Sequence, residues 1–197
     1  MILGNGLMAT TFSRYSEQAD VIIFASGVSN SSETRVEAFN REIVLLKNTC
    51  KNLHNQLLVY FSTTSIVDLE LSDSPYITHK LEIENFISKW CNHYMIFRLP
   101  QVVGKTQNPH TIVNFIYNHI MEGKNFNVWQ HACRNLIDVT DVYHLADYFI
   151  QNRIFKNQVT TIATPINVKV LDIVKILENL LKKKQFLQFW NEVVVTR

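Results

Sequence analysis

The sequence places a phenol and an ammonium group one helical turn apart. Tyr76 and Lys80 occur in the stretch SPYITHK, which begins a predicted helix, and helix positions i and i+4 lie on one face. Free tyrosine has a pKa near 10, too high for a base at neutral pH, but a nearby ammonium group favours the phenolate. The pair therefore has the composition of an acid/base catalyst. On a helix surface, such a pair is also common without any function.

A glycine motif near the start of the chain offers a second kind of chemistry. The stretch GNGLMA fits the pattern G-x-G-x-x-A, with Gly4 and Gly6 at its glycine positions and Leu7 and Met8 between the second glycine and the alanine. After a strand and before a helix, this pattern brings backbone close to the pyrophosphate of a dinucleotide. A simple turn between a strand and a helix is the alternative. The acidic residue expected about 20 positions later is missing, because Asp20 begins a strand instead of ending one.

Short apolar stretches alternate with longer amphipathic ones, and these must position both motifs. Strands are predicted at residues 1–5, 20–27, 56–63, 94–100 and 159–164, and helices at 6–15, 31–53, 74–93, 110–123 and 169–184. Residues 134–152 predict a strand, a turn at Thr140-Asp141 and a helix, in which Asp141 is expected to cap the helix. Ser32 and Ser74 are expected at helix starts, the latter with Pro75 at the first helical position. This order predicts a parallel sheet with helices on both faces and right-handed crossovers.

Composition narrows the class of protein. The chain has 197 residues, 47% of them hydrophobic and 18% charged, which suits one globular domain. A net charge of +2 gives no reason to expect nucleic acid or an anionic membrane as a partner. Cys50, Cys91 and Cys133 have no metal-ligand spacing and suggest a reducing compartment, and no apolar run is long enough to span a membrane. A cytoplasmic protein without a metal site is predicted.

The motifs occur in an order that resembles a known family. GNGLMA, DVIIFASG, FNREIVLLKNTCK, YFSTTS, YITHK, FRLPQVVGK and RNLIDVTDV follow one another as in the extended short-chain dehydrogenase/reductases, the NAD-dependent epimerase/dehydratase family. The resemblance is closest to sugar-nucleotide reductases of surface-polysaccharide synthesis. It implies a Rossmann-like, doubly wound parallel sheet, shortened in its N-terminal half, with a small C-terminal substrate lobe. The chain 1–197 would be one domain, its dinucleotide-binding part at about 1–105 and its lobe drawn mainly from 106–197.

The resemblance also implies roles for individual residues. Tyr76 is the general acid/base, Lys80 lowers its pKa and binds the nicotinamide ribose, and Thr64, or next Thr63, holds the substrate oxygen. Asn40 matches a buried asparagine beneath the active site, with a solvated helix face as the alternative. Arg134 matches an arginine that binds the nucleotide diphosphate, a task that suits its planar charged fork. The other expected cofactor contacts are Ala25, Ser26, Gly27, Arg35, Leu99, Pro100 and Val102.

Together these features predict an NAD(P)-dependent reductase or epimerase that acts on a nucleotide-activated sugar. It would not be a 4,6-dehydratase, because Ser65-Ile66 stands where those enzymes carry Asp-Glu. NADP is favoured over NAD because no acid repels a 2′-phosphate and Arg35 could reach it. Phe189 and Trp190 near the end of the chain either cover a hydrophobic surface or form a homodimer contact. The alternative function is a non-catalytic NAD(P)-binding regulatory subunit on the same fold.

Overall fold

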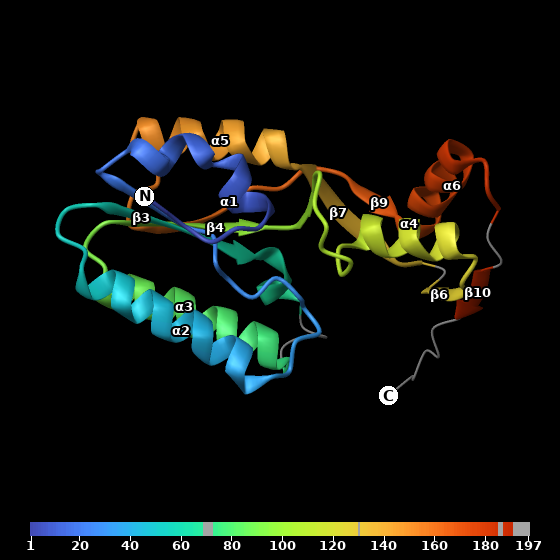
Figure 1. Ribbon diagram of the computed structural model, residues 1–197, viewed down its shortest axis with the longest axis horizontal. Coiled ribbons are helices and arrows are strands. Elements are labelled where there is room, and N and C mark those ends of the chain that lie inside the picture. The colour runs from blue at the N-terminus through green and yellow to red at the C-terminus, as the bar shows by residue number, and fades with distance from the viewer. Residues whose placement is uncertain (69–72, 130, 185–186, 191–197) are drawn as a thin grey trace.

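The computed structural model describes residues 1–68, 73–129, 131–184 and 187–190. They form a larger α/β body and a smaller lobe beside it (Figure 1). The larger body is built on a five-stranded parallel sheet in the order β1-β2-β3-β4-β8. Its strands are β1 (Ile2–Leu3), β2 (Val21–Phe24), β3 (Leu57–Thr63), β4 (Tyr94–Leu99) and β8 (Gln158–Thr161). The predicted α/β class and parallel sheet are confirmed.

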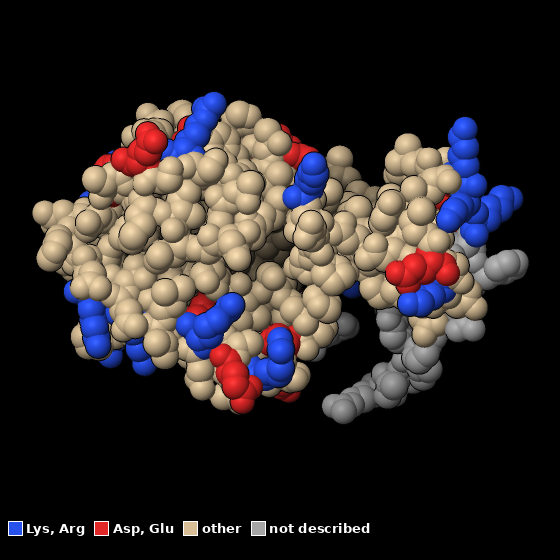
Figure 2. All heavy atoms as spheres, viewed as in Figure 1, with Lys and Arg blue, Asp and Glu red and all other residues tan. Residues whose placement is uncertain are grey.

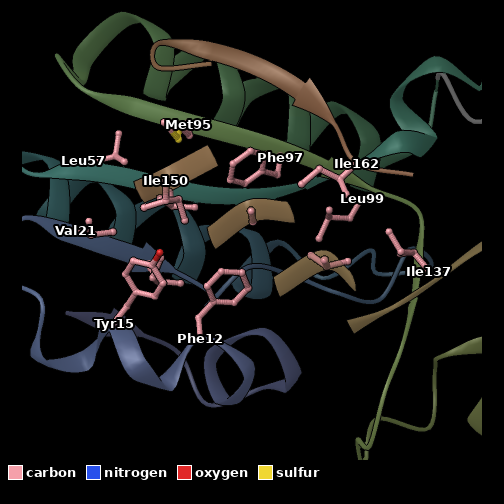
Figure 3. Close-up of a cluster of buried hydrophobic side chains, with 14 residues drawn as sticks. Phe12, Tyr15, Val21, Leu57, Met95, Phe97, Leu99, Ile137, Ile150 and Ile162 are labelled. Carbon is pink, nitrogen blue, oxygen red and sulfur yellow. The ribbon is translucent and has the colours of Figure 1, made fainter. Parts of the chain in front are cut away.

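Helices cover both faces of this sheet (Figure 1). On one face lie α1 (Leu7–Thr11), the 3-10 helix η1 (Ser13–Glu17) and α5 (Val139–Gln151), and on the other lie α2 (Val36–Lys51) and α3 (Pro75–Trp90). Each face has its own apolar core. In the first core, Phe12 and Tyr15 meet Ile150 of α5 over the sheet residues Met95 and Phe97 (Figure 3). Strands buried on both faces explain the continuous apolar runs in the sequence.

The connections over the two faces differ in hand. From β1 to β4 the strands lie in chain order, so every connection moves the chain one position in the same direction. The connections through α2 and α3 cross one face, whereas the connection through α1 and η1 crosses the other. Equal steps over opposite faces have opposite hands, so the prediction of right-handed crossovers throughout is wrong. In a doubly wound sheet a helix on the α1 face leads to further strands beyond β1, but here residues 4–20 return directly to β2.

Two predicted helix starts are also wrong. The helix expected from Ser32 begins at Val36. Residues 31–32 form a turn instead, and the Glu33 carboxylate accepts hydrogen bonds from the backbone N–H and the side chain of Arg35. The turn expected at Thr140-Asp141 is the first turn of α5. Its cap is Asp138, whose carboxylate accepts a hydrogen bond from the Thr140 N–H at 2.7 Å.

The smaller lobe follows β4 in the chain and has its own core. Its three-stranded sheet runs β5-β7-β9, with β5 (Gln101–Val103), β7 (Cys133–Asp138) and β9 (Asn167–Lys169). Apolar side chains of α4 (Ile112–Glu122), β6 (Phe126–Trp129) and α6 (Val170–Leu181) form the core of the lobe. β10 (Leu187–Trp190) pairs with β6. The prediction that Phe189 and Trp190 cover a hydrophobic surface or form a homodimer contact concerns side chains that the structure does not describe.

The surface in view carries acidic and basic side chains interspersed over the larger body, and it is hollowed where the two bodies meet (Figure 2). In the described part of the chain, no helix is long and apolar enough to cross a membrane.

Candidate active site

Tyr76 and Lys80 lie on the buried face of α3. Their exposed fractions are 7% and 2%, so the helix turns both side chains onto the sheet. The helix begins at Pro75, as predicted, because proline lacks only an N–H that has no partner in a first helical turn. Tyr76 contacts Thr63 at the end of β3, and Lys80 contacts the loop that follows β2. The pair therefore lies at the carboxyl ends of parallel strands, where α/β proteins bind ligands.

Lys80 is held by a network of buried polar groups. Its Nζ donates to the Tyr60 hydroxyl at 2.8 Å and to Glu42 Oε1 at 3.3 Å. The Glu42 carboxylate also accepts bonds from the Tyr60 hydroxyl at 2.7 Å and the Val28 N–H at 2.7 Å, and lies 2.8 Å from His79 Nε2. An ammonium group has three N–H donors, and these two bonds leave one of them for a ligand hydroxyl.

Burial and pairing compete in setting the charges of this network. Burial alone would raise the pKa of Glu42, but the hydrogen bond with His79, the charge of Lys80 and the bonds from Tyr60 and Val28 lower it to about 2. Glu42 is therefore a carboxylate. Burial lowers the pKa of Lys80, and the charge of Glu42 opposes that effect. Burial also raises the pKa of Tyr60 well above its usual value, so this residue stays a phenol.

The pKa of Tyr76 moves in the direction opposite to the one predicted. Burial raises it to about 12, a hydrogen bond with Thr63 lowers it in part, and the charge of Glu42 raises it further. The Lys80 ammonium lies 5.7 Å from the centre of the Tyr76 ring, but it shares its charge with Glu42. The sequence suggested a phenolate favoured by lysine, and the tertiary structure instead favours a neutral phenol.

The structure brings Thr63, and not the favoured Thr64, against Tyr76. Thr63 is the last residue of β3 and is 9% exposed, and its Oγ1 also accepts a bond from the Ser65 N–H at 3.1 Å. Thr64 begins the 3-10 helix η2 (Thr64–Val67) and is partly exposed.

A second buried ion pair fixes α3 on the sheet. Glu84 lies one turn beyond Lys80 and is 4% exposed. The Arg98 guanidinium of β4 binds it with both arms, at 3.0 Å from Nε and 2.6 Å from Nη2, and the Ser62 hydroxyl binds it at 2.5 Å. Because Tyr76, Lys80 and Glu84 share one helix face, this pair sets the position of the two candidate catalytic groups.

The glycine motif forms a tight turn after β1. Gly4 has a φ of +128°, and a Cβ there would lie 2.3 Å from the Ala25 carbonyl oxygen, so only glycine fits. A Cβ at Gly6 would meet nothing within 4 Å, so the space above this turn is open. α1, which follows, has five residues.

The remaining predicted residues lie in different surroundings. Met8, Ala25, Leu99 and Val102 pack in or against the core that faces α5. Asn40 is exposed, so the expectation that it is buried is wrong. Arg134 is exposed on β7 in the smaller lobe, and its Nη1 donates to the Cys133 carbonyl at 2.8 Å. Leu7 lies beside Gly104, and Pro100 is partly buried between β4 and β5. The Ser26 carbonyl accepts a hydrogen bond from the Arg41 guanidinium at 3.4 Å.

An open groove of about 530 Å³ lies between the loop after β2 and the start of α2. Gly27 and Val28, which contact the Lys80 network from one side, line it, together with Glu33, Arg35 and Arg41. The Arg35 guanidinium is held by the Glu33 carboxylate at 2.6 Å and 2.9 Å. Its charge is therefore already paired.

Sequence reasoning missed Glu42, Tyr60 and His79. The signal for Glu42 was present, because it lies about one helical turn from each of the apolar residues Phe39 and Leu46. A carboxylate on such a face is seldom buried without a partner. Nothing in the spacing indicates that Tyr60 and His79 are those partners.

Residues 4–163 match the model of the NAD dependent epimerase/dehydratase family. The chain belongs to this family. No curated protein sequence matches it.

Solved structures of epimerases resemble the fold. The UDP-glucose 4-epimerase of Thermus thermophilus in complex with NAD has 14% identity and a TM-score of 0.69, over 95% of this chain and 70% of that one. The UDP-glucuronic acid 4-epimerase of Bacillus cereus in complex with UDP-glucuronic acid and NAD has 19% identity and a TM-score of 0.71, over 92% and 65%. An epimerase of Methanothermobacter thermautotrophicus has 13% identity and a TM-score of 0.73, over 96% and 66%. At these identities the likeness concerns the fold, and the chain spans about two thirds of each relative.

Proposed function

We propose that the protein is an NAD(P)-dependent oxidoreductase or epimerase that acts on a nucleotide-activated sugar. The observation that carries this proposal is the buried Tyr76–Lys80 pair beside the Thr63 hydroxyl, at the carboxyl ends of β2 and β3. A protein that only binds a ligand, without catalysis, has no need for a buried ammonium group next to a buried phenol. The family and the nucleotide-sugar epimerases with the same fold support the substrate class.

The residues present fit a nicotinamide dinucleotide in part. Open space at Gly6 and the close backbone turn at Gly4 suit a pyrophosphate, and the remaining N–H of Lys80 suits a ribose hydroxyl. When bound, the cofactor supplies or accepts a hydride. The chain itself supplies the proton chemistry: Tyr76 exchanges the proton of the sugar oxygen, and Thr63 or Thr64 polarises that oxygen. Arg134 would bind the diphosphate of the substrate.

Two finer assignments belong to this proposal. The sequence Ser65-Ile66 after the threonines favours a reductase or epimerase over a 4,6-dehydratase, and the reductases of surface-polysaccharide synthesis in the cytoplasm are the favoured group. NADP(H) should bind at least as tightly as NAD(H), because residues 4–20 contain no strand that ends in a ribose-binding acid. Arg35 contributes less to this preference than its position suggests, since Glu33 already holds its guanidinium.

The test is a ligand screen followed by one substitution. NAD(H), NADP(H) and a panel of UDP-, GDP- and dTDP-sugars are added to the protein, and a ligand that binds the native state raises the melting temperature. Turnover is then measured in two ways. Loss of NADPH or NADH absorbance with keto-sugar nucleotides reports a reductase, and conversion of a sugar nucleotide to its epimer reports an epimerase, because an epimerase regenerates its cofactor. Tyr76→Phe should abolish most turnover and leave cofactor binding unchanged, whereas Tyr148→Phe, a control at an exposed tyrosine, should change neither. Full activity in Tyr76→Phe would show the assignment to be wrong.

A non-catalytic NAD(P)-binding subunit is the second candidate. The short β1-to-β2 connection favours it, because none of the described residues forms a strand beyond β1, on the side where the adenosine half of a dinucleotide usually binds. Such a protein would enhance NADPH fluorescence on binding, but it would neither consume NADPH with any sugar nucleotide in the panel nor convert any of them to its epimer.

A further inference from the structure

Cys50 and Cys91 are in contact, although their positions in the sequence differ by 41. Cys50 lies in the last turn of α2, and Cys91 directly follows α3. The two helices lie side by side on one face of the sheet, and they bring their C-terminal ends together there (Figure 1). The two Sγ atoms are 3.0 Å apart, and both cysteines are free thiols. Spacing along the chain contains no sign of this pair.

The surroundings of the pair are apolar. Cys91 is buried in the core beneath α2 and α3 with Leu46 and Ile87, while Cys50 packs against the edge of that core and is partly exposed. Packing accounts for each cysteine separately, because a thiol behaves as a small apolar group. The contact between the sulfur atoms adds chemistry. The bond of a disulfide is about 2.05 Å long, so the two atoms need to approach each other by only roughly 1 Å.

The two thiols differ in accessibility and in acidity. The hydrogen bond with Cys91 lowers the pKa of Cys50, against the effect of burial, and the same bond, together with burial, raises the pKa of Cys91. The reactive form of cysteine is the thiolate, so the partly exposed Cys50 is the sulfur that reacts first with an oxidant from solution. Cys91 lies behind it, where it can react with an oxidised Cys50 without meeting the oxidant itself.

We propose that Cys50 and Cys91 form a reversible disulfide site whose oxidant is a hydroperoxide. The Cys50 thiolate attacks one peroxide oxygen, the O–O bond breaks, and Cys50 becomes a sulfenic acid. The Cys91 sulfur then attacks the Cys50 sulfur, the S–O bond breaks, and the hydroxyl leaves with the Cys91 proton as water. Two electrons pass from the two thiols to the peroxide. A dithiol reverses the reaction by exchange and is itself oxidised to a disulfide.

The disulfide would join α2 to α3 at the ends remote from the candidate active site. Glu42 lies about two helical turns before Cys50, and Tyr76 lies at the opposite end of α3 from Cys91. A cross-link between distant parts of the chain restricts the unfolded state, so the oxidised protein should be more stable than the reduced one. In a reducing compartment, which the sequence predicts, both thiols would stay free until peroxide accumulates.

The experiment detects the bond itself. Reduced wild-type protein is treated with hydrogen peroxide, at concentrations raised until the exposed Cys133 of the smaller lobe is oxidised. Remaining thiols are alkylated, and the peptides are analysed by mass spectrometry without reduction. The expected product is a pair of peptides linked through Cys50 and Cys91 within one chain, which dithiothreitol separates. The oxidised protein should also melt at a higher temperature than the reduced protein.

Matched variants separate the roles of the three cysteines. Cys133→Ser should form the same disulfide and show the same rise in melting temperature. Cys91→Ser lacks the second thiol, so peroxide should leave Cys50 as a sulfenic acid, which dimedone traps, and should not raise the melting temperature.

Two results in the wild type, which need no variant to fold, would overturn the proposal. One is that Cys50 and Cys91 are both still alkylated once Cys133 is oxidised. The other is a disulfide that links Cys50 to a second chain in place of Cys91. Because neither cofactor nor substrate is added, the outcome is independent of the screen that tests the proposed function.

Discussion

The ion pair between Arg98 and Glu84 allows a sharp test of how α3 is held. Arg98→Met keeps the length of the side chain and removes the guanidinium, which leaves Glu84 buried with the Ser62 hydroxyl as its remaining partner among those described above. Removing one member of a buried ion pair costs about 3–5 kcal/mol of unfolding free energy. The Arg98 side chain is 23% exposed, so water can reach the site and the cost should be near the lower value, about 3 kcal/mol.

The assays are equilibrium unfolding in urea, which gives the free energy of unfolding, and thermal unfolding, both followed by circular dichroism. A loss of about 3 kcal/mol lowers the melting temperature by roughly 6–12 °C in a chain of this size. The control is Lys124→Met, which breaks a pair with Glu122 at the same N–O distance of 2.6 Å but with side chains 67% and 53% exposed. Pairs as exposed as this one contribute little to stability, so this variant should be nearly as stable as the wild type.

The double variant Arg98→Met/Glu84→Gln tests the physical cause. If the cost arises from an unpaired buried charge, neutralising Glu84 should restore part of the stability that Arg98→Met removes. An Arg98→Met variant that is no less stable than Lys124→Met would contradict a buried pair, because it would show that the charges of Arg98 and Glu84 interact as if they were in water.

Three further predictions follow from the site. The pKa of Glu42 is about 2, against an ordinary value of 4.5, so its ionised form stabilises the folded protein by on the order of 3 kcal/mol. This stabilisation is present above pH 4.5 and is lost as the pH falls toward 2. The urea concentration at the unfolding midpoint should therefore fall over this pH range in the wild type and change less in Glu42→Gln. Gly4→Ala should unfold at a much lower temperature than the wild type, because its Cβ would lie 2.3 Å from a backbone oxygen, whereas Gly6→Ala should melt like the wild type. Gly6→Val should stay folded and bind NAD(P)H more weakly. Equal melting temperatures of Gly4→Ala and Gly6→Ala would contradict this geometry. Arg35→Ala should leave the ratio of the NADP(H) and NAD(H) dissociation constants unchanged in calorimetric titrations, and a narrowed ratio would show that the arginine reaches the cofactor despite its carboxylate partner.

Local patterns were sufficient for the class of fold and for the main candidate residues. Continuous apolar runs indicated strands buried on both faces, and Pro75 marked the start of α3 because the physics of a helix terminus is local. The four-residue spacing of Tyr76 and Lys80 also placed both side chains on one helix face, because the helical repeat is local as well. The start of α2 was predicted wrongly, because an ion pair between Glu33 and Arg35 competes with helix formation by these residues.

The environment of those residues was decided by tertiary structure alone. Tyr76 is a neutral phenol instead of a lysine-stabilised phenolate, because burial and the carboxylate of Glu42, which comes from a different helix, outweigh the neighbouring lysine. The hand of the β1-to-β2 connection depends on which face α1 covers, and spacing along the chain contains no information about that. Residue types and their spacing along the chain were enough to indicate which side chains could do chemistry. Only the packing of α2 and α3 on the sheet determined their charge, because desolvation and Coulomb interactions depend on distances between groups that are remote in the chain.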